Sequence, residues 1–222
     1  MMTTLLVVAS TRTASAQLRG PGLPALAVAS KKLVPGLWVR YAIVNTGASQ
    51  AMLVYIAALE RKGDAQWFEM SITGGQRRTL LMRTLVKGLG GKDPSKVKVV
   101  EAIVQPPGQR PLRLPSEAAN KQRPPVQAAS NLSRGHGAKV TRNVRVQVAG
   151  GAFTTTHFRR RVGGHEEQTW MSAALGAWPL VKYQLGTLSI ELVAHGKSAS
   201  TRIQGEPVKL DKRLLKQLGG AP

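Results

Sequence analysis

The sequence predicts a mainly β protein, built as a curved antiparallel sheet or open half-barrel with a few short helices, including one at the C-terminus. Three observations support this fold class. About ten segments alternate apolar and polar side chains or are rich in β-branched and aromatic residues. Clusters of glycine, proline and asparagine separate these segments. No long helical pattern lies between them, which is typical of meanders, sandwiches and open barrels.

The chain divides into four parts. Residues 1–16 are expected to be a signal peptide, residues 17–35 a linker with a short helix, residues 36–207 a single β half-barrel domain, and residues 208–222 a C-terminal helix or tail. The first part has a short apolar run followed by Ala14-Ser15-Ala16, a small-x-small cleavage pattern that predicts a periplasmic or secreted bacterial protein. No basic residue precedes the run, which a start codon further upstream would explain; the alternative is an irregular terminus.

The first strands are expected in the N-terminal half of the β domain. Residues 38–44 are rich in β-forming residues, and residues 52–59 form a nearly continuous apolar run, which predicts a strand buried on both faces. Residues 66–73 alternate, with Phe68, Met70 and Ile72 on one side. Further strands are expected at residues 79–86, 97–105 and 112–114, and one or two helical turns at residues 116–122.

The remaining strands follow a polar loop. Residues 139–149 alternate cleanly, which places the valines from Val140 to Val148 on one face and polar residues on the other. A strand with one buried and one solvent-exposed face is typical of antiparallel sheets. The stretch 146–182 reads as strand, Gly-rich turn, strand, turn, strand, loop and strand, and residues 188–195 alternate again.

The tail over residues 208–219 has a helical pattern. Leu210, Leu214 and Leu218 recur every four residues, lysines and an arginine lie between them, and Gly219 provides a stop. We therefore expect a C-terminal helix that docks on the sheet or lies on an anionic surface.

The charge of the chain is strongly basic and uneven. Lys and Arg number 32 against 11 Asp and Glu, a net charge of +21, and residues 77–161 hold 18 basic and three acidic residues, a local +15. Such a field attracts an anionic membrane surface or nucleic acid, and it is also compatible with a merely solvated surface. An aromatic content of 5% is low for stacking nucleic-acid bases. No stretch of 18 apolar residues predicts a transmembrane helix.

Catalytic and metal-binding patterns are missing from the sequence. The histidines, at positions 136, 157, 165 and 195, lack the spacing of a metal site, and cysteine is absent. No pair of acids suggests glycoside chemistry, and no Gly-x-Ser-x-Gly elbow occurs. We expect a protein that is not an enzyme and carries no metal or cofactor; a hydrolase with an unrecognised site is the alternative.

The run Arg159-Arg160-Arg161 is the densest arginine cluster. Strand alternation sends Arg160 to the opposite face from its neighbours, so the run is not a three-pronged anion clamp. Arg159 and Arg161 are left as the candidate anion-facing residues.

Three short segments resemble a known family. Residues 149–158 (AGGAFTTTHF) resemble a hairpin of the periplasmic lipoprotein-carrier-like (LolA/LolB-type) proteins, and Trp170-Met171-Ser172 with Pro179-Leu180-Val181-Lys182 resembles their strand-loop-strand. Residues 36–41 (GLWVRY) resemble the opening strand of related secreted bacterial proteins. The chain departs from the pattern at Pro179, where the family has glycine.

The resemblance implies an exported envelope protein, a half-barrel whose apolar concave side binds a lipid, a lipoprotein or another hydrophobic ligand. The candidate lining residues are Trp38, Tyr41, Trp67, Phe68, Trp170 and Trp178. The alternative for each of these residues is an ordinary core side chain. The alternative function is a basic nucleic-acid-binding module, with nucleic acid the less favoured partner.

Export predicts a specific mature N-terminus. We expect the protein recovered from its own cells to begin at Gln17, because signal peptidase cleaves after small-x-small patterns. Intact-mass and peptide mass spectrometry would measure it, since an N-terminal glutamine can cyclise and block stepwise sequencing. A recovered chain that retains residues 1–16 would contradict both the signal peptide and the periplasmic location.

Overall fold

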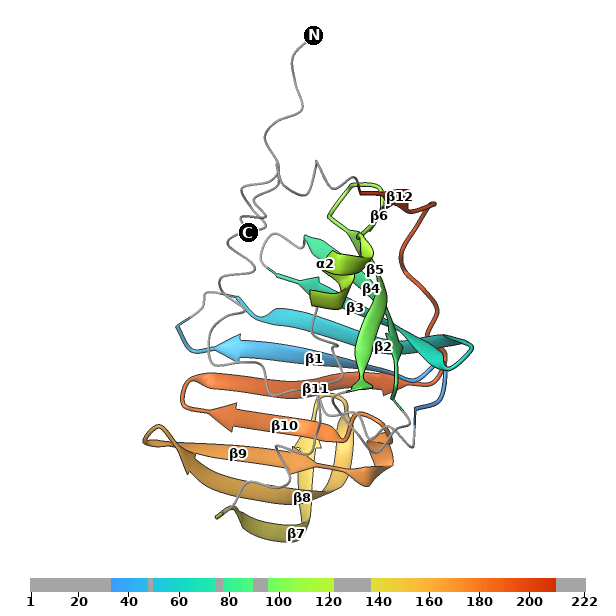
Figure 1. The fold of residues 1–222 in the computed structure, drawn as a ribbon. Coiled ribbons are helices and arrows are strands. Elements are labelled where there is room, and N and C mark those ends of the chain that lie inside the picture. Colours follow the sequence, from blue (N-terminus) through green and yellow to red (C-terminus); the bar gives the residue numbers. More distant parts are fainter. Residues whose placement is uncertain (1–32, 48–49, 75–77, 90–95, 122–136, 211–222) are drawn as a thin grey trace.

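The computed structural model describes residues 33–47, 50–74, 78–89, 96–121 and 137–210 (Figure 1). Within these residues the chain forms one 12-stranded sheet in the order β12-β6-β5-β4-β3-β2-β1-β11-β10-β9-β8-β7. All neighbouring strands are antiparallel except β12 and β6. The protein is therefore mainly β with an open sheet, as expected. The signal peptide and the short helix expected before residue 33 lie outside the described residues.

The elements follow the expected positions closely. The first group is β1 (Trp38–Asn45), β2 (Met52–Lys62), β3 (Ala65–Thr73), β4 (Thr79–Lys87), β5 (Lys98–Gln105), β6 (Leu112–Arg113) and α2 (Ser116–Lys121). The second group is β7 (Lys139–Val148), β8 (Gly151–Val162), β9 (His165–Met171), the 3-10 helix η4 (Ala173–Leu175), β10 (Leu180–Leu185), β11 (Leu188–Gly196) and β12 (Val208–Lys209). Up to β11, the strand ranges expected from the sequence agree with these bounds within three residues.

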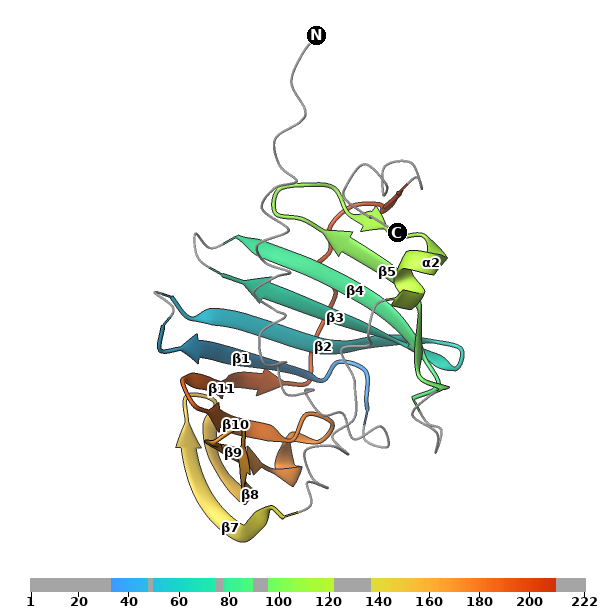
Figure 2. The same ribbon diagram turned by 60° about the vertical axis from the view of Figure 1, so that its left-hand side comes forward.

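Two meanders make up the sheet. Strands β1 to β6 form one and β7 to β11 form the other, and β1 pairs with both β2 and β11. The first strand of one meander thus joins the last strand of the other. The sheet curves strongly between its two ends (Figures 1 and 2). We call the face that carries Tyr41 and Phe68 the inner face, and the face that carries Tyr55 and Trp67 the outer face.

The core has two layers, one on each face of the central strands. The larger layer lies on the inner face and the smaller one on the outer face. Every residue from Val54 to Leu59 in β2 is buried, with Ile56 on the inner and Tyr55 on the outer face. This confirms the prediction, made from the continuous apolar run, that β2 is buried on both sides.

A segment that follows β11 covers the outer face. We call residues 197–207 the outer strap; they cross the outer face from β11 to β12 (Figure 2). Ile203 of the strap packs on the outer layer. The Glu69 carboxylate, 0% exposed in β3, accepts hydrogen bonds from the Thr201 hydroxyl at 2.7 Å and the Arg202 backbone N–H at 2.9 Å. A buried carboxylate is therefore the anchor of the strap.

The expected C-terminal helix is wrong at its beginning. Val208–Lys209 form strand β12, which pairs in parallel with Leu112–Arg113 of β6. The Leu210 backbone N–H continues the pairing by donating to the Arg113 carbonyl at 3.0 Å. An open strand edge offers hydrogen-bonding groups that a local leucine repeat cannot offer, so tertiary pairing prevails over the helical pattern. Residues 211–222 lie outside the described residues.

Strand β7 contains a bulge that the alternation pattern did not reveal. Asn143 has a φ of 59°, and the register with β8 shifts at this point. Val140 pairs with Phe158, whereas Val144 pairs with Thr155. Phe158 and Thr155 are three residues apart and so lie on opposite faces of β8. The predicted common face of the valines is therefore wrong: the extra residue turns Val140 away from the later ones.

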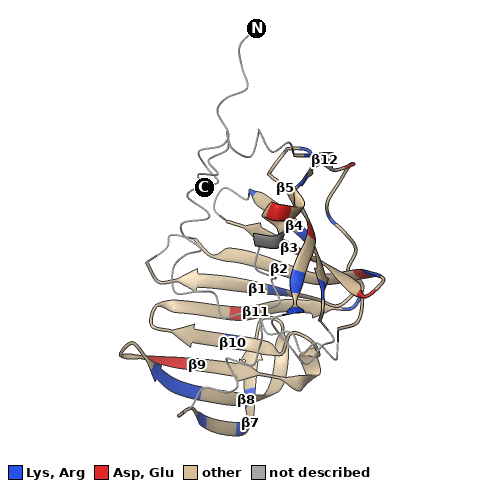
Figure 3. Cartoon of the chain, viewed as in Figure 1, with Lys and Arg blue, Asp and Glu red and all other residues tan. Residues whose placement is uncertain are grey.

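Basic residues are concentrated in the last two strands of the sheet. Lys and Arg positions are marked along β7 and β8, and neither strand contains an acidic residue (Figure 3). Those of β7 are Lys139, Arg142 and Arg145, and those of β8 are the three arginines from Arg159 to Arg161. This end of the sheet accounts for part of the basic middle of the sequence.

The anchor of the outer strap gives a testable prediction. Glu69→Ala removes the acceptor and leaves the Thr201 hydroxyl and the Arg202 amide without their partner, which should lower the free energy of unfolding by about 2–3 kcal/mol. Urea denaturation measures this loss, and hydrogen exchange should show faster exchange at residues 199–204. The matched control is Glu60→Ala, because Glu60 forms only an exposed ion pair with Arg83 and should change stability by less than about 1 kcal/mol. Equal losses in the two variants would contradict the anchoring role.

Candidate functional site

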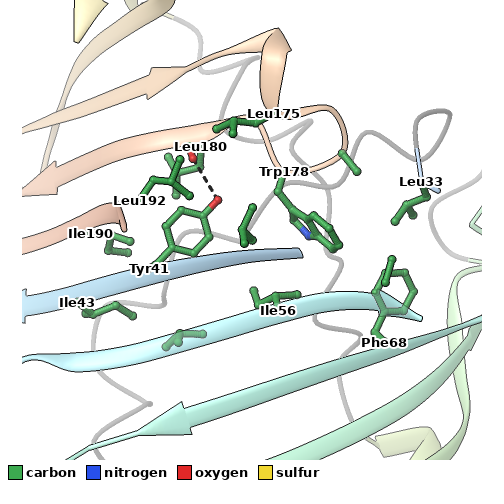
Figure 4. Close-up of a cluster of buried hydrophobic side chains, with 14 of the residues drawn as sticks. Leu33, Tyr41, Ile43, Ile56, Phe68, Leu175, Trp178, Leu180, Ile190 and Leu192 are labelled. Carbon is green, nitrogen blue, oxygen red and sulfur yellow. Dashed lines mark hydrogen bonds between the residues drawn. The ribbon is translucent and has the colours of Figure 1, made fainter. Parts of the chain in front are cut away.

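The inner face holds a compact group of aromatic side chains. We call Tyr41, Phe68 and Trp178 the inner aromatic cluster; they come from β1, from β3 and from the loop before β10 (Figure 4). All three are buried, and they share a layer with aliphatic side chains such as Ile56 and Leu192. The Tyr41 hydroxyl donates a hydrogen bond to the Leu180 carbonyl at 3.1 Å. Burial raises the pKa of the Tyr41 phenol well above its ordinary value.

The loop between β9 and β10 places Trp178 in this cluster. The Ser172 backbone N–H donates to the Pro179 carbonyl at 2.7 Å, which closes the base of the loop. Gly176 ends η4 with a φ of 66° and gives the loop the left-handed turn it needs. Leu175, Ala177 and Trp178 are buried as a result. Pro179 occupies the glycine position of the family pattern without disturbing the loop, because its carbonyl and not an N–H is used here.

A hairpin arm packs on the same inner layer. We give this name to residues 144–155, where β8 pairs with β7 alone because the β8–β9 pairing begins at Thr156. At the tip of the arm, the Gly150 N–H donates to the Leu192 carbonyl at 3.0 Å. A side chain at position 150 would meet Leu192 at 3.0 Å, so the close approach favours glycine. The Ser172 hydroxyl donates to the Thr154 carbonyl at 2.9 Å and links arm and loop.

The indole N–H of Trp178 is buried without a hydrogen-bond partner among the described residues. Trp178 is 1% exposed, and its neighbours in the layer are apolar. A buried donor that lacks an acceptor costs about 1–3 kcal/mol, so most buried indoles are paired. The unsatisfied N–H is the feature of the inner face that an incoming acceptor group would satisfy.

The six candidate lining residues do not come together. Trp38 and Trp67 lie in the outer layer, where Trp38 contacts Tyr55 with ring centroids 5.6 Å apart. The Arg83 guanidinium lies 4.5 Å from the centre of the Trp67 ring. Both tryptophans therefore belong to the face that the outer strap covers, and they cannot line a site with Trp178.

Trp170 occupies a third position. Its ring stacks on His157 at 4.3 Å, and the Lys182 ammonium lies 5.8 Å from its centre. The His157 ring also bonds the Gln168 side chain at 3.0 Å. Burial is the main cause that lowers the pKa of His157, and the charge of Arg159 adds to it. Both outweigh the hydrogen bond that the ring donates to Gln168 Oε1, which raises the pKa. The stacked pair is a half-buried cross-strand contact that packs at the margin of the inner layer.

The three arginines of β8 separate as strand alternation predicts. Arg160 forms an ion pair with buried Glu167, which also accepts a hydrogen bond from the Tyr183 hydroxyl at 2.9 Å. Burial, together with the bond to Glu167, raises the pKa of Tyr183. On the other face, Arg159 lies 3.9 Å from Glu166, and Arg161 is exposed. The anion-facing role of Arg159 and Arg161 stays a prediction.

A small pocket of about 180 Å³ lies near the β2–β3 turn. It is lined by Leu33, Arg61, Gly63, Asp64, Ala65, Gln66 and Leu89. Its volume is below the roughly 300 Å³ at which ligand pockets usually begin. Arg61 bonds both Gln66 and the Leu33 carbonyl, so its polar lining is already satisfied.

Metal and membrane features can be stated for the described residues only. Among them, no three His, Asp or Glu side chains gather as metal ligands would. None of their helices has the length and apolar character needed to cross a bilayer.

The fold is thus that of an open, curved antiparallel sheet closed on its inner face by a loop and a hairpin arm. No family model and no curated protein matches the chain. Among solved structures, it is similar to MucB, with a TM-score of 0.46, 12% identity, and coverage of 88% of this chain and 63% of that chain. For MucB in complex with MucA(peri) the TM-score is 0.44, the identity 11%, and the coverage 80% and 55%.

A third similar structure is a Bacteroides fragilis protein described as exported, with a YmcC-like fold. Its TM-score is 0.34 and its identity 9%, and the match covers 74% of this chain and 97% of that one. The present chain spans less than two thirds of either MucB chain. At this level of similarity, the function of the chain rests on its own residues.

The buried phenol of Tyr41 predicts how stability changes at high pH. Unfolding returns the phenol to a pKa near 10.0, so above that pH the unfolded chain loses a proton that the folded chain keeps. The stabilisation is complete below pH 10 and is lost as the pH rises towards the folded pKa. Between pH 9 and pH 11, Tyr41→Phe should lose about 1.4 kcal/mol less stability than the wild type.

Guanidinium denaturation at each pH measures this difference. Ile43→Val is the matched control, because it perturbs the same inner layer and leaves every phenol in place. It should follow the wild-type pH dependence. Burial also raises the pKa of Tyr55 and Tyr183, so part of the alkaline loss remains in Tyr41→Phe. Identical pH profiles for Tyr41→Phe and the wild type would show that the phenol is not buried as described.

Proposed function

We propose that this chain is an exported, non-catalytic envelope protein that binds an acyl-containing apolar ligand, a lipid or the acyl group of a lipoprotein, at the inner aromatic cluster. The observation that carries the proposal is the unpartnered N–H of Trp178 within an apolar layer. An acyl carbonyl bonded to hydrocarbon is the chemistry that satisfies both features at once. The Lol-type motifs and the signal-like start of the sequence support the same class of protein.

Access to the cluster requires a part of its cover to move. The loop at residues 172–179 and the hairpin arm are joined to each other by the Ser172–Thr154 bond, and the arm is fixed to β11 by the Gly150–Leu192 bond. Each of these hydrogen bonds contributes only about 1 kcal/mol net. In the proposal, the arm and the loop separate when the ligand enters, and the apolar surface of the ligand replaces the contacts they lose.

The test compares two probes on the delipidated protein. One probe is a fluorescent fatty-acid methyl ester, which has an acyl carbonyl; the other is a fluorescent hydrocarbon of similar length without an acceptor. Trp178→Phe removes the N–H and should weaken binding of the ester about five- to tenfold, while binding of the hydrocarbon changes less. Fluorescence titration gives both affinities.

Trp67→Phe is the matched control, because it makes the same substitution on the outer face. It should leave both affinities within about twofold of the wild type. The proposal fails if neither probe binds, or if Trp178→Phe and Trp67→Phe weaken binding of the ester equally. A labelled oligonucleotide in the same series tests the alternative function: tight binding at low salt that weakens steeply as salt is added would favour the nucleic-acid module.

A further inference from the structure

Strand β7 is the long edge of the sheet. It pairs with β8 on one side, and within the described residues no strand pairs with its other side. The opposite edge of the sheet is β12, which has two residues, whereas β7 has ten. An edge strand directs alternate N–H and C=O groups away from the sheet, so this length of β7 is a template for an added strand.

The charges on β7 are all of one sign. Lys139, Arg142 and Arg145 are exposed, and no carboxylate of the described residues forms an ion pair with any of them. Arg161 is exposed on the neighbouring strand β8. The edge is therefore a cationic row without a carboxylate partner among the residues that the structure describes.

These charges select between the partners that an open edge could take. A second copy of the chain, paired through the same edge, would bring Lys and Arg against Lys and Arg, which is destabilising for cross-strand neighbours. Natural sheets use such charges and bulges to prevent self-pairing. An extended segment with acidic side chains meets the opposite condition, because its backbone completes the ladder and its carboxylates face the basic row.

We propose that the free edge of β7 binds an extended acidic segment of a partner protein as an added β-strand. The bulge at Asn143 divides the edge in two. The longer continuous part comprises residues 144–148 and includes Arg145. The shorter part includes Val140, which is 49% exposed and adds apolar contact. This edge uses none of the three aromatic side chains of the inner cluster, although residues 144–148 also belong to the hairpin arm that moves in the proposed function.

The probe is a fluorescein-labelled peptide of ten residues that alternates threonine and glutamate, which matches the length of β7. Fluorescence anisotropy with the full chain at about 0.01 M salt should show binding that weakens at 0.15 M, where the screening length is about 8 Å. Hydrogen exchange should slow at the backbone amides of residues 139–148. The same peptide N-methylated at alternate residues keeps its charge and cannot complete the ladder, so it should bind at least about tenfold more weakly.

The double variant Arg142→Glu with Arg145→Glu should weaken binding of the unmodified peptide by about tenfold or more. The matched control is Lys98→Glu with Arg110→Glu, which makes the same charge change at exposed positions in and after β5. It should stay within about threefold of the wild type. Circular dichroism and thermal unfolding of both variants establish that they fold.

Four outcomes would overturn the inference. Equal loss in both double variants would mean that only net charge attracts the peptide. If the N-methylated peptide bound as tightly as the unmodified one, the peptide would not bind as an added β-strand. Dimerisation of the wild-type chain in analytical ultracentrifugation, abolished by the Arg142 and Arg145 changes, would assign the edge to a second copy. Failure of the peptide to bind at low salt would also reject the proposal.

Discussion

The pairing of β1 with β11 is the contact on which the rest of the structure depends. It joins residues about 150 positions apart and fuses two meanders into one sheet. Tyr41 lies in this ladder, and its hydroxyl reaches the carbonyl of Leu180 in the second meander. The loop with Trp178 and the hairpin arm both belong to the second meander, and both pack in the inner layer that the two meanders share. Without the β1–β11 ladder, this layer would be divided in two.

Local chemistry specified the strands but not how they are bent. Alternation and Gly-rich turns located β1 to β11 because both signals are confined to a few neighbouring residues. The bulge at Asn143 depends on a left-handed backbone, which asparagine adopts more readily than most other residues, and nothing in the valine pattern indicates it. At Val208–Lys209, where the helical pattern begins, an open edge at β6 took precedence, and that edge becomes available only once the sheet has formed.

Part of the site could have been derived from alternation alone. Trp67 and Phe68 are consecutive in β3 and so must lie on opposite faces, which already excludes a single lining that contains both. The two-residue turn Gly163-Gly164 likewise fixes Arg160 opposite Glu167, an ion pair that sequence reasoning missed. The sequence contains no comparable signal for the outer strap. Its residues form no regular secondary structure, and its anchor, Glu69, is a single acidic residue in the alternating strand β3.

The outer strap also orders the events of synthesis. The chain emerges from the N-terminus, so β2, β3 and β5 are available long before the residues that cover their outer face. Until the segment after β11 has been made, the layer of Tyr55, Trp67 and Ile103 lacks the contacts that Ala199 and Ile203 supply. Half-made chains with exposed apolar surface are prone to associate. The strap thus buries apolar surface that the nascent protein exposes. A chain truncated before the strap would depend on chaperones to avoid aggregation.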